Sequence, residues 1–260
     1  MKNGVTDQLT YFNAVGNPDL TCIEVNADDV AYATENWTSA DGNIDEGVTF
    51  SDTCVVQGNP DYTYVPDDNF EQALIELGYD DVLDNFVVTD SISVVTKLLV
   101  YSKGISDLTG IENFTALDTL ICSNNQLTEL NLSSNTALTR LSVDENEITS
   151  LDLSNNTALT FLSCNYNLIT SLDMSNNTAL TSLYGYNNQL TNLNVSNNIA
   201  LTSLLVSHNN LTSLDVTNNT ALRSLLCNYN VITSLDVTNN TALKTLYCNT
   251  NQLTSLGCEQ

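Results

Sequence analysis

The chain holds few residues that could carry out acid–base or nucleophilic chemistry. His208 is its only histidine, so a catalytic triad or a histidine-rich metal site would depend on this one side chain. Aspartates recur at regular positions, and a repeating structure explains them better than a catalytic carboxylate pair does: Asp152, Asp173, Asp215 and Asp236. The sequence therefore predicts a protein that is not an enzyme and has no cofactor.

Cysteine is the other residue type with reactive or metal-binding potential, and seven are present. Four share one position of a repeat in which other copies have Val143, Val206 or Gly185: Cys122, Cys164, Cys227 and Cys248. Exchange with valine predicts a buried apolar side chain, and metal binding would need converging ligands, so we predict no metal site here. Cys22 and Cys54 flank an acidic, loop-rich segment and are candidates for a disulfide if the protein is exported.

One acidic segment has two interpretations. Asp41, Asn43 and Asp45, followed by Asp52, have spacing similar to that of a calcium-binding loop. Glu46 occupies the position that should be glycine, and no flanking helices are evident. We favour a solvated acidic loop, with calcium binding as the alternative.

The charge balance excludes several partner classes. Six Lys and Arg stand against 31 Asp and Glu, giving a net charge of −25. Nucleic acid and anionic membrane surfaces would repel such a chain, and no stretch approaches the roughly 20 apolar residues of a membrane span. Residues 1–94 carry 19 acidic residues and one basic residue, whereas residues 95–260 carry 12 and five. Most of the negative charge therefore precedes the repeats.

The elements that position these residues are set by a 21-residue period. Leucine recurs at that interval, each time followed three residues later by leucine and eight residues later by asparagine; the first leucines are Leu117, Leu138, Leu159, Leu180, Leu201, Leu222 and Leu243. The segment after the first leucine alternates with period two, which predicts a strand with one face buried. A coil this short cannot bury its own apolar side chains, so neighbouring coils must cover them. We predict a leucine-rich-repeat solenoid, with a curved parallel β-ladder on its concave side and an irregular, turn-like convex side.

The repeat L-T-x-L-x-C-x-x-N-x-L-T-x-L-D-V-S-x-N-T-A resembles the cysteine-containing repeats of internalin-like bacterial surface proteins, of the internalin J type and of Bacteroidetes. The resemblance covers residues 95–260. It implies a protein that is secreted or attached to the cell surface, as part of a longer chain, and that recognises a protein or a glycan with its concave face.

Four segments are expected along the chain. Residues 1–54 resemble the closing cap of a preceding repeat array, residues 55–64 are a linker, residues 65–94 form a helical cap, and residues 95–260 form eight coils, the last incomplete. The cap is expected to contain a helix over 67–78, with Asp67 or Asp68 capping its start, Glu71 completing a capping box and Gly78 at its end.

The outward strand positions and the residues beside them are the candidate binding surface. They combine aromatic residues with Ser, Thr and Asn and have almost no Lys or Glu, which is typical of an interface. The candidate ligand-binding residues are Tyr101, Ile121, Arg140, Phe161, Tyr166, Tyr184, Tyr186, Leu205, His208, Leu226, Tyr229 and Tyr247. The favoured function is recognition or adhesion; the alternatives are a structural spacer and an accessory domain of a secreted carbohydrate-active enzyme.

Overall fold

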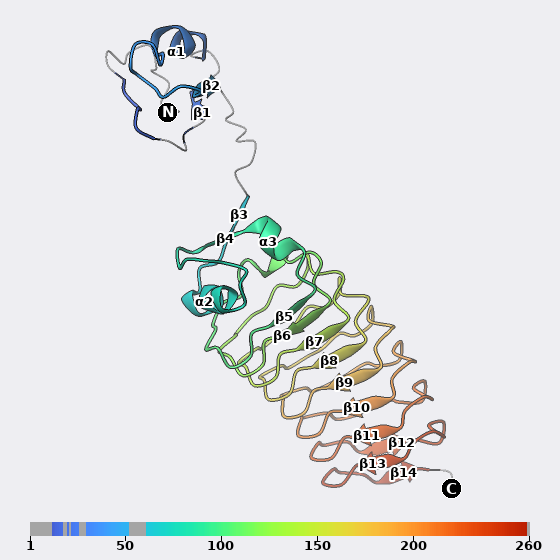
Figure 1. Cartoon of the computed structure of the whole chain (residues 1–260). Coiled ribbons are helices and arrows are strands. Elements are labelled where there is room, and N and C mark those ends of the chain that lie inside the picture. The colour runs from blue at the N-terminus through green and yellow to red at the C-terminus, as the bar shows by residue number, and fades with distance from the viewer. Residues whose placement is uncertain (1–11, 18–19, 21, 26–29, 52–60, 259–260) are drawn as a thin grey trace. The chain divides into compact units, whose positions relative to one another are not determined.

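The computed structural model describes residues 12–17, 20, 22–25, 30–51 and 61–258 (Figure 1). The chain divides into two compact units, residues 1–59 and 60–260. Within the described ranges, no helix is both long and apolar enough to cross a membrane.

The first unit is a small α/β assembly. Strands β1 (Cys22–Glu24) and β2 (Thr49–Ser51) are parallel, and α1 (Val30–Asn36) lies between them in sequence. Trp37 is buried with Val25 and Ala33, and the ring of Phe12 stacks on it at 4.6 Å. This apolar core is independent of the repeats, and the interpretation of residues 1–54 as a closing cap stays a prediction.

The second unit begins with a cap that shares the core of the first coils. Its elements are β3 (Tyr62–Tyr64), α2 (Asp68–Glu76), β4 (Phe86–Val88) and α3 (Thr89–Ser93), and β3 pairs antiparallel with β4. Residues 62–64, expected to be linker, are therefore part of the cap. Phe70 on α2 lies 6.3 Å from the ring of Phe114 in the first coil. Because α2 buries its apolar side there, it covers core that the first coil could not cover alone.

The ends of α2 agree with the expected boundaries, but Glu71 has a different role. Asp67 caps the helix by accepting from the backbone N–H groups of Asn69 and Phe70, and Gly78 has φ of 80° just after the helix. Glu71 does not form a capping box. It is fully buried, and its Oε1 accepts from the N–H groups of Asp84 and Phe86, so it fixes the loop that leads into β4.

Eight short strands form one parallel sheet, one strand from each coil (Figure 1). Neighbours pair in register, and the central leucine of each strand faces the core, where seven are fully buried and Leu246 in the last strand is half-buried. The strands are β5 (Lys97–Leu99), β6 (Thr119–Ile121), β7 (Arg140–Ser142), β8 (Phe161–Ser163), β9 (Ser182–Tyr184), β10 (Ser203–Leu205), β11 (Ser224–Leu226) and β13 (Thr245–Tyr247). The predicted solenoid and its register are confirmed.

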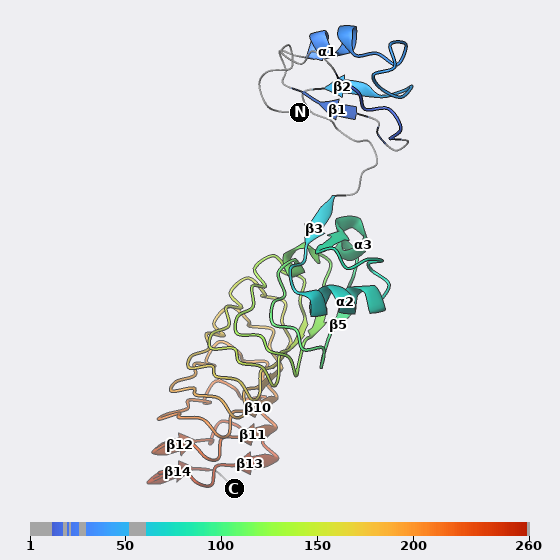
Figure 2. The same cartoon turned by 90° about the vertical axis from the view of Figure 1, so that its left-hand side faces the viewer.

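The other side of the coil is more regular than expected. It carries the 3₁₀ helix η3 (Ile111–Asn113) in the first coil, and in the last coils β12 (Ser234–Asp236) pairs parallel with β14 (Ser255–Gly257). Figure 2 shows this pair on the side opposite β11 and β13. The turn-like description holds for the middle coils, and the C-terminal coils have a second, short ladder.

Two columns of asparagine tie the coils together. In the turn after each strand, Asn167 donates from Nδ2 to Val143 O of the preceding coil at 2.9 Å and accepts from Ile148 N at 3.0 Å. On the opposite side, Asn177 donates to Leu153 O and Asn156 O. Asparagines of both columns therefore bond the backbone of the neighbouring coil.

Candidate binding surface

We call the outward surface of the eight-stranded sheet the ladder face. It consists of the first and third residue of each strand and the two residues that precede the asparagine of the following turn. All twelve predicted ligand-binding residues lie on it, and none is buried. Five are exposed and the others are half-buried; the exposed ones are Tyr101, Arg140, Tyr166, Tyr229 and Tyr247.

The first side-chain cluster joins three neighbouring strands. The guanidinium carbon of Arg140 lies 3.8 Å from the ring centroid of Phe161, which is a cation–π geometry. Phe161 in turn meets Tyr184 edge-to-face, with ring centroids 5.3 Å apart. Register pairing places Arg140 beside Phe161, so the sheet itself brings the cation to the ring.

The second cluster is a row of four rings that crosses four coils. Tyr166 meets Tyr186 at 5.1 Å, Tyr186 meets His208 at 4.9 Å, and His208 stacks on Tyr229 at 4.1 Å with 21° between the planes. The sequence placed all four residues on the candidate binding surface, and the structure adds the contacts between their rings. We call these four residues the aromatic row.

The backbone explains how the aromatic row is held. In all eight coils, the residue before the turn position that asparagine occupies in seven coils and Lys103 in the first has φ between 53° and 56°. This left-handed conformation favours Gly, Asn, Asp and His. Asn124, Asn187 and His208 follow that preference, whereas Tyr166 and Tyr229 do not. Left-handed backbone at a non-glycine residue costs on the order of 1 kcal/mol, so these aromatic side chains occupy positions where they reduce stability.

A hydrogen-bond network makes some side chains of the ladder face inaccessible to a ligand. Asp144 accepts from the hydroxyls of Ser142 and Ser163 and from the backbone N–H of Asn165, and Ser207 donates to Asn228 Oδ1 at 2.6 Å. Ser163 and Ser207 occupy outward positions of the repeat, but both are buried. Their partners come from adjacent coils and cover them, so they are not available to a ligand.

Three of the four cysteines that were predicted to be buried are buried, and Cys248 in the last coil is half-buried. Burial raises the pKa of the Cys122, Cys164 and Cys227 thiols to about 12, so they stay protonated at neutral pH. Cys22 is disulfide-bonded, and Cys54, its expected partner, lies outside the described residues.

The recurrent aspartates act locally, as expected from the repeat. Asp152 Oδ1 accepts from the backbone N–H of Ser154 at 2.9 Å, and the same bond recurs at Asp173, Asp215 and Asp236. This backbone hydrogen bond is the main reason that the pKa of Asp152 lies below its ordinary value. These carboxylates therefore cap turns.

The predicted acidic loop of the first unit holds its side chains apart. Asp41 Oδ2 accepts from the Thr38 hydroxyl, Asn43 donates to Phe12 O, and Asp45 accepts from Asn17 N. Asp52, the fourth residue of the calcium alternative, lies outside the described residues. In the part of the chain that is described, no group of three or more His, Cys, Asp or Glu side chains is arranged to hold a metal ion.

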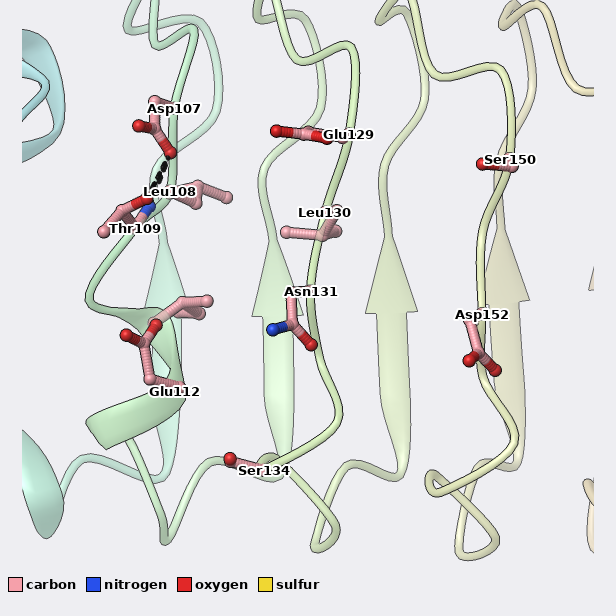
Figure 3. Close-up of a pocket in the computed structure, with 11 residues that line it drawn as sticks. Asp107, Leu108, Thr109, Glu112, Glu129, Leu130, Asn131, Ser134, Ser150 and Asp152 are labelled. Carbon is pink, nitrogen blue, oxygen red and sulfur yellow. Dashed lines mark hydrogen bonds between the residues drawn. The ribbon is translucent and has the colours of Figure 1, made fainter.

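A hollow of about 540 Å³ lies away from the ladder face, on the first three coils. Figure 3 shows Asp107, Glu112, Glu129 and Asp152 around it, on segments that pass in front of the strands. Asp107 accepts from Thr109, Glu112 from Gly110 and Asp152 from Ser154, so three of the four carboxylates have local structural roles. The sequence analysis did not identify this hollow, because its lining comes from different coils.

Comparisons with known proteins agree with the repeat and the fold. No protein-family model matches the chain. Internalin J of Listeria monocytogenes serotype 4b (strain F2365) is 36% identical over 127 residues, which is 49% of this chain and 14% of that protein. A solved functional domain of InlJ from L. monocytogenes, described as including a cysteine ladder, is 33% identical with a TM-score of 0.59, covering 77% of this chain and 52% of that one. The present chain thus spans a small part of internalin J and about half of its solved domain.

Two further solved structures share the fold. Internalin C2 of L. monocytogenes str. 4b F2365 has a TM-score of 0.67 at 20% identity, covering 76% of this chain and 92% of that one. The leucine-rich-repeat ectodomain of the plant receptor kinase GASSHO1/SCHENGEN3 from Arabidopsis thaliana, solved in complex with CASPARIAN STRIP INTEGRITY FACTOR 2, has a TM-score of 0.53 at 24% identity, covering 58% of this chain and 20% of that one. The 21-residue period, the cysteine column and these comparisons together show a leucine-rich-repeat solenoid that is similar to the solved domain of InlJ.

Proposed function

We propose that the ladder face is a protein-recognition surface in a secreted or surface-attached protein, and that the chain has no catalytic activity of its own. The main support for this proposal is the pair of aromatic clusters, Arg140–Phe161–Tyr184 and the aromatic row. From β8 to the turn after β11, the ladder face has no Asp, Glu, Lys or Arg. Exposed aromatic residues without Lys and Glu are typical of interface centres.

The backbone supports a functional role for the aromatic row. Tyr166 and Tyr229 stand where asparagine or glycine would be more stable. Retention of stability-reducing residues on an exposed surface is characteristic of functional sites. A spacer would have no need for aromatic residues at these positions, so this observation favours recognition over the spacer alternative.

The ring geometry favours a protein partner over a glycan. A sugar stacks on a free, flat ring face. Here Phe161 and Tyr184 are at 79°, Tyr166 and Tyr186 at 64°, and His208 uses a face against Tyr229. The rings therefore form an uneven ridge that suits side chains better than pyranose rings.

A double substitution tests the proposal. Tyr184→Ala with Tyr186→Ala removes one ring from each cluster, and each substitution is expected to weaken adhesion or pull-down of the partner by about ten-fold, since truncated interface tyrosines commonly cost over 1 kcal/mol. Ile199→Ala, at a residue 64% exposed outside the ladder face, is the control. If the double variant keeps its circular dichroism spectrum and binds like the parent chain, the ladder face is not the recognition surface and the spacer interpretation is preferred.

A further inference from the structure

The C-terminal half of the ladder face has an apolar stripe at right angles to its strands. The third residues of β9, β10, β11 and β13 are register neighbours. They are Tyr184, Leu205, Leu226 and Tyr247, and each is half-buried or exposed. No polar residue interrupts this stripe, unlike the same column in β7 and β8, which contains Ser142 and Ser163.

The two flanks of the stripe differ. On one side lie Tyr186, His208 and Tyr229 of the aromatic row. On the other side the first strand residues are hydroxyl-bearing: Ser182, Ser203, Ser224 and Thr245.

Two bases border the hydroxyl side. Arg223 directly precedes β11 and Lys244 directly precedes β13, in consecutive coils linked by the bond from Lys244 N to Arg223 O at 2.8 Å. Both residues are exposed, and no ion pair joins either to a carboxylate of the described residues. In a chain with a net charge of −25, this rim is a local positive site.

The spacing of the stripe selects a conformation for the bound segment. Four strands about 4.8 Å apart span about 14 Å along the solenoid axis. Successive turns of an α-helix advance about 5.4 Å, so four turns on one side span about 16 Å, a mismatch of about 2 Å that side-chain rotamers absorb. Same-face residues of an extended strand are about 6.7 Å apart and span about 20 Å. A helix lying across the strands therefore matches the stripe, and an extended peptide does not.

We propose that this stripe binds an amphipathic α-helix of a protein partner, with the apolar side of the helix on Tyr184, Leu205, Leu226 and Tyr247 and acidic residues along the flank that faces Arg223 and Lys244. The inference rests on the proposed function of the ladder face and specifies the partner for it. Charge complementarity sets the orientation of the helix, because Arg223 and Lys244 lie on the hydroxyl side of the stripe and the aromatic flank contains no Lys or Arg.

A selection from a phage library of random 16-residue peptides against the whole chain tests the proposal. Enriched peptides are expected to have apolar residues at i, i+3 or i+4, and i+7, with Asp or Glu on one flank. Synthetic copies are expected to gain helical circular dichroism on binding. Their affinity, measured by fluorescence anisotropy, is expected to fall about ten-fold in Arg223→Glu/Lys244→Glu. Thr157→Glu/Thr178→Glu adds negative charge at two exposed residues outside the ladder face and should leave the affinity unchanged.

The remaining outcomes separate this inference from the proposed function. Some enriched peptides could lose binding in Leu205→Ser/Leu226→Ser and yet be proline-rich, alternate with period two or be basic. Such peptides would refute the proposal of an acidic amphipathic helix and leave protein recognition by the ladder face in place. Peptides that bind Leu205→Ser/Leu226→Ser as well as the parent chain, or an absence of enrichment, would overturn the helix as well. The Tyr184 and Tyr186 variants decide the proposed function independently, with the natural partner.

Discussion

The two asparagine columns should contribute unequally to stability, although both are buried. Asn167→Ala and Asn177→Ala remove the same atoms from neighbouring positions of the array, so the loss of side-chain volume is common to both. The difference between them therefore isolates the hydrogen bonds. Asn167 uses its oxygen and its nitrogen, accepting from Ile148 N at 3.0 Å. Asn177 uses only its nitrogen, and its Oδ1 is buried without a hydrogen-bond partner.

The difference in the free energy of unfolding depends on the backbone groups that lose their partner when the asparagine side chain is removed. Without Asn167, the Ile148 N–H is buried and loses the acceptor that the side chain supplied, and an unsatisfied buried donor costs about 1–3 kcal/mol. Without Asn177, Leu153 O still accepts a hydrogen bond from Asn156 N, and Asn156 O still accepts one from Leu159 N. The substitution also removes Asn177 Oδ1, which is buried without a hydrogen-bond partner. We expect Asn167→Ala to lower the free energy of unfolding by about 2 kcal/mol more than Asn177→Ala does.

Urea denaturation followed by far-ultraviolet circular dichroism measures this difference. For an array of this size, about 2 kcal/mol separates the midpoints by about 0.8 M urea. Asn176→Ala, at an exposed asparagine that donates to Ser154 O at 3.2 Å, should shift the midpoint little. If Asn177→Ala is as destabilising as Asn167→Ala, or more so, the assignment of stability to the Ile148 bond is wrong.

Four further predictions follow from the core, the backbone, the titratable groups and the thiols. Gly185→Ala should raise the free energy of unfolding by about 1 kcal/mol, because a Cβ there meets only ordinary contacts of 3.7 Å or more; a lower urea midpoint would show that the core cannot accept it. Glu145→Asn should stabilise by about 0.5–1 kcal/mol by relieving left-handed backbone, and an unchanged midpoint would remove the stability argument for the aromatic row. Burial opposes the shift, but hydrogen bonds from Ser106, Phe70 and Asp107 hold the pKa of Asp67 below its ordinary 3.8. The stabilisation that Asp67 gives to the cap should therefore be complete above pH 3.8 and lost as the pH falls through the lower pKa of the folded state. Asp67→Asn should make the melting temperature depend less on pH in this acid range, and an unchanged pH dependence of the melting temperature would contradict the prediction. In the native protein a thiol reagent should modify exposed Cys258 quickly and buried Cys164 only on unfolding; rapid labelling of both would indicate local opening of the core.

The period alone predicted the positions that matter most for the fold. Leucine at every twenty-first residue placed Leu162 and its equivalents in the core and predicted the register, because a one-residue slip would expose every one of them. Exchange of Cys164 with Val143 predicted its burial. The apolar spacing of Phe70, Ala73 and Leu74 predicted the cap helix. Each of these inferences depends on the local pattern of a few residues, which a sequence displays directly.

Other features depend on contacts between coils and could not be predicted in the same way. Ser163 fits an outward position, and only Asp144 of the preceding coil buries it. Glu71 fits a capping box, but Asp84 and Phe86 provide better donors after the loop closes. The left-handed position was hidden because Glu145 and Tyr229 are not residues that favour it. A sequence signal did exist, since Asn124 and Asn187 occupy the same column.

The ladder face combines these two kinds of information. The repeat gives the coils nearly the same backbone, so neighbouring coils differ mainly in the side chains that point outward. A ligand would be recognised through these differences between coils. In the N-terminal half, Ile121 and Phe161 alternate with polar residues, and Asp144 is occupied by internal hydrogen bonds. In the C-terminal half they are apolar and aromatic, and Arg223 and Lys244 form the positive rim. Because the stripe from Tyr184 to Tyr247 requires four coils to be in register, removing a single coil should weaken binding more than any single side-chain substitution does, whereas a spacer would only become shorter.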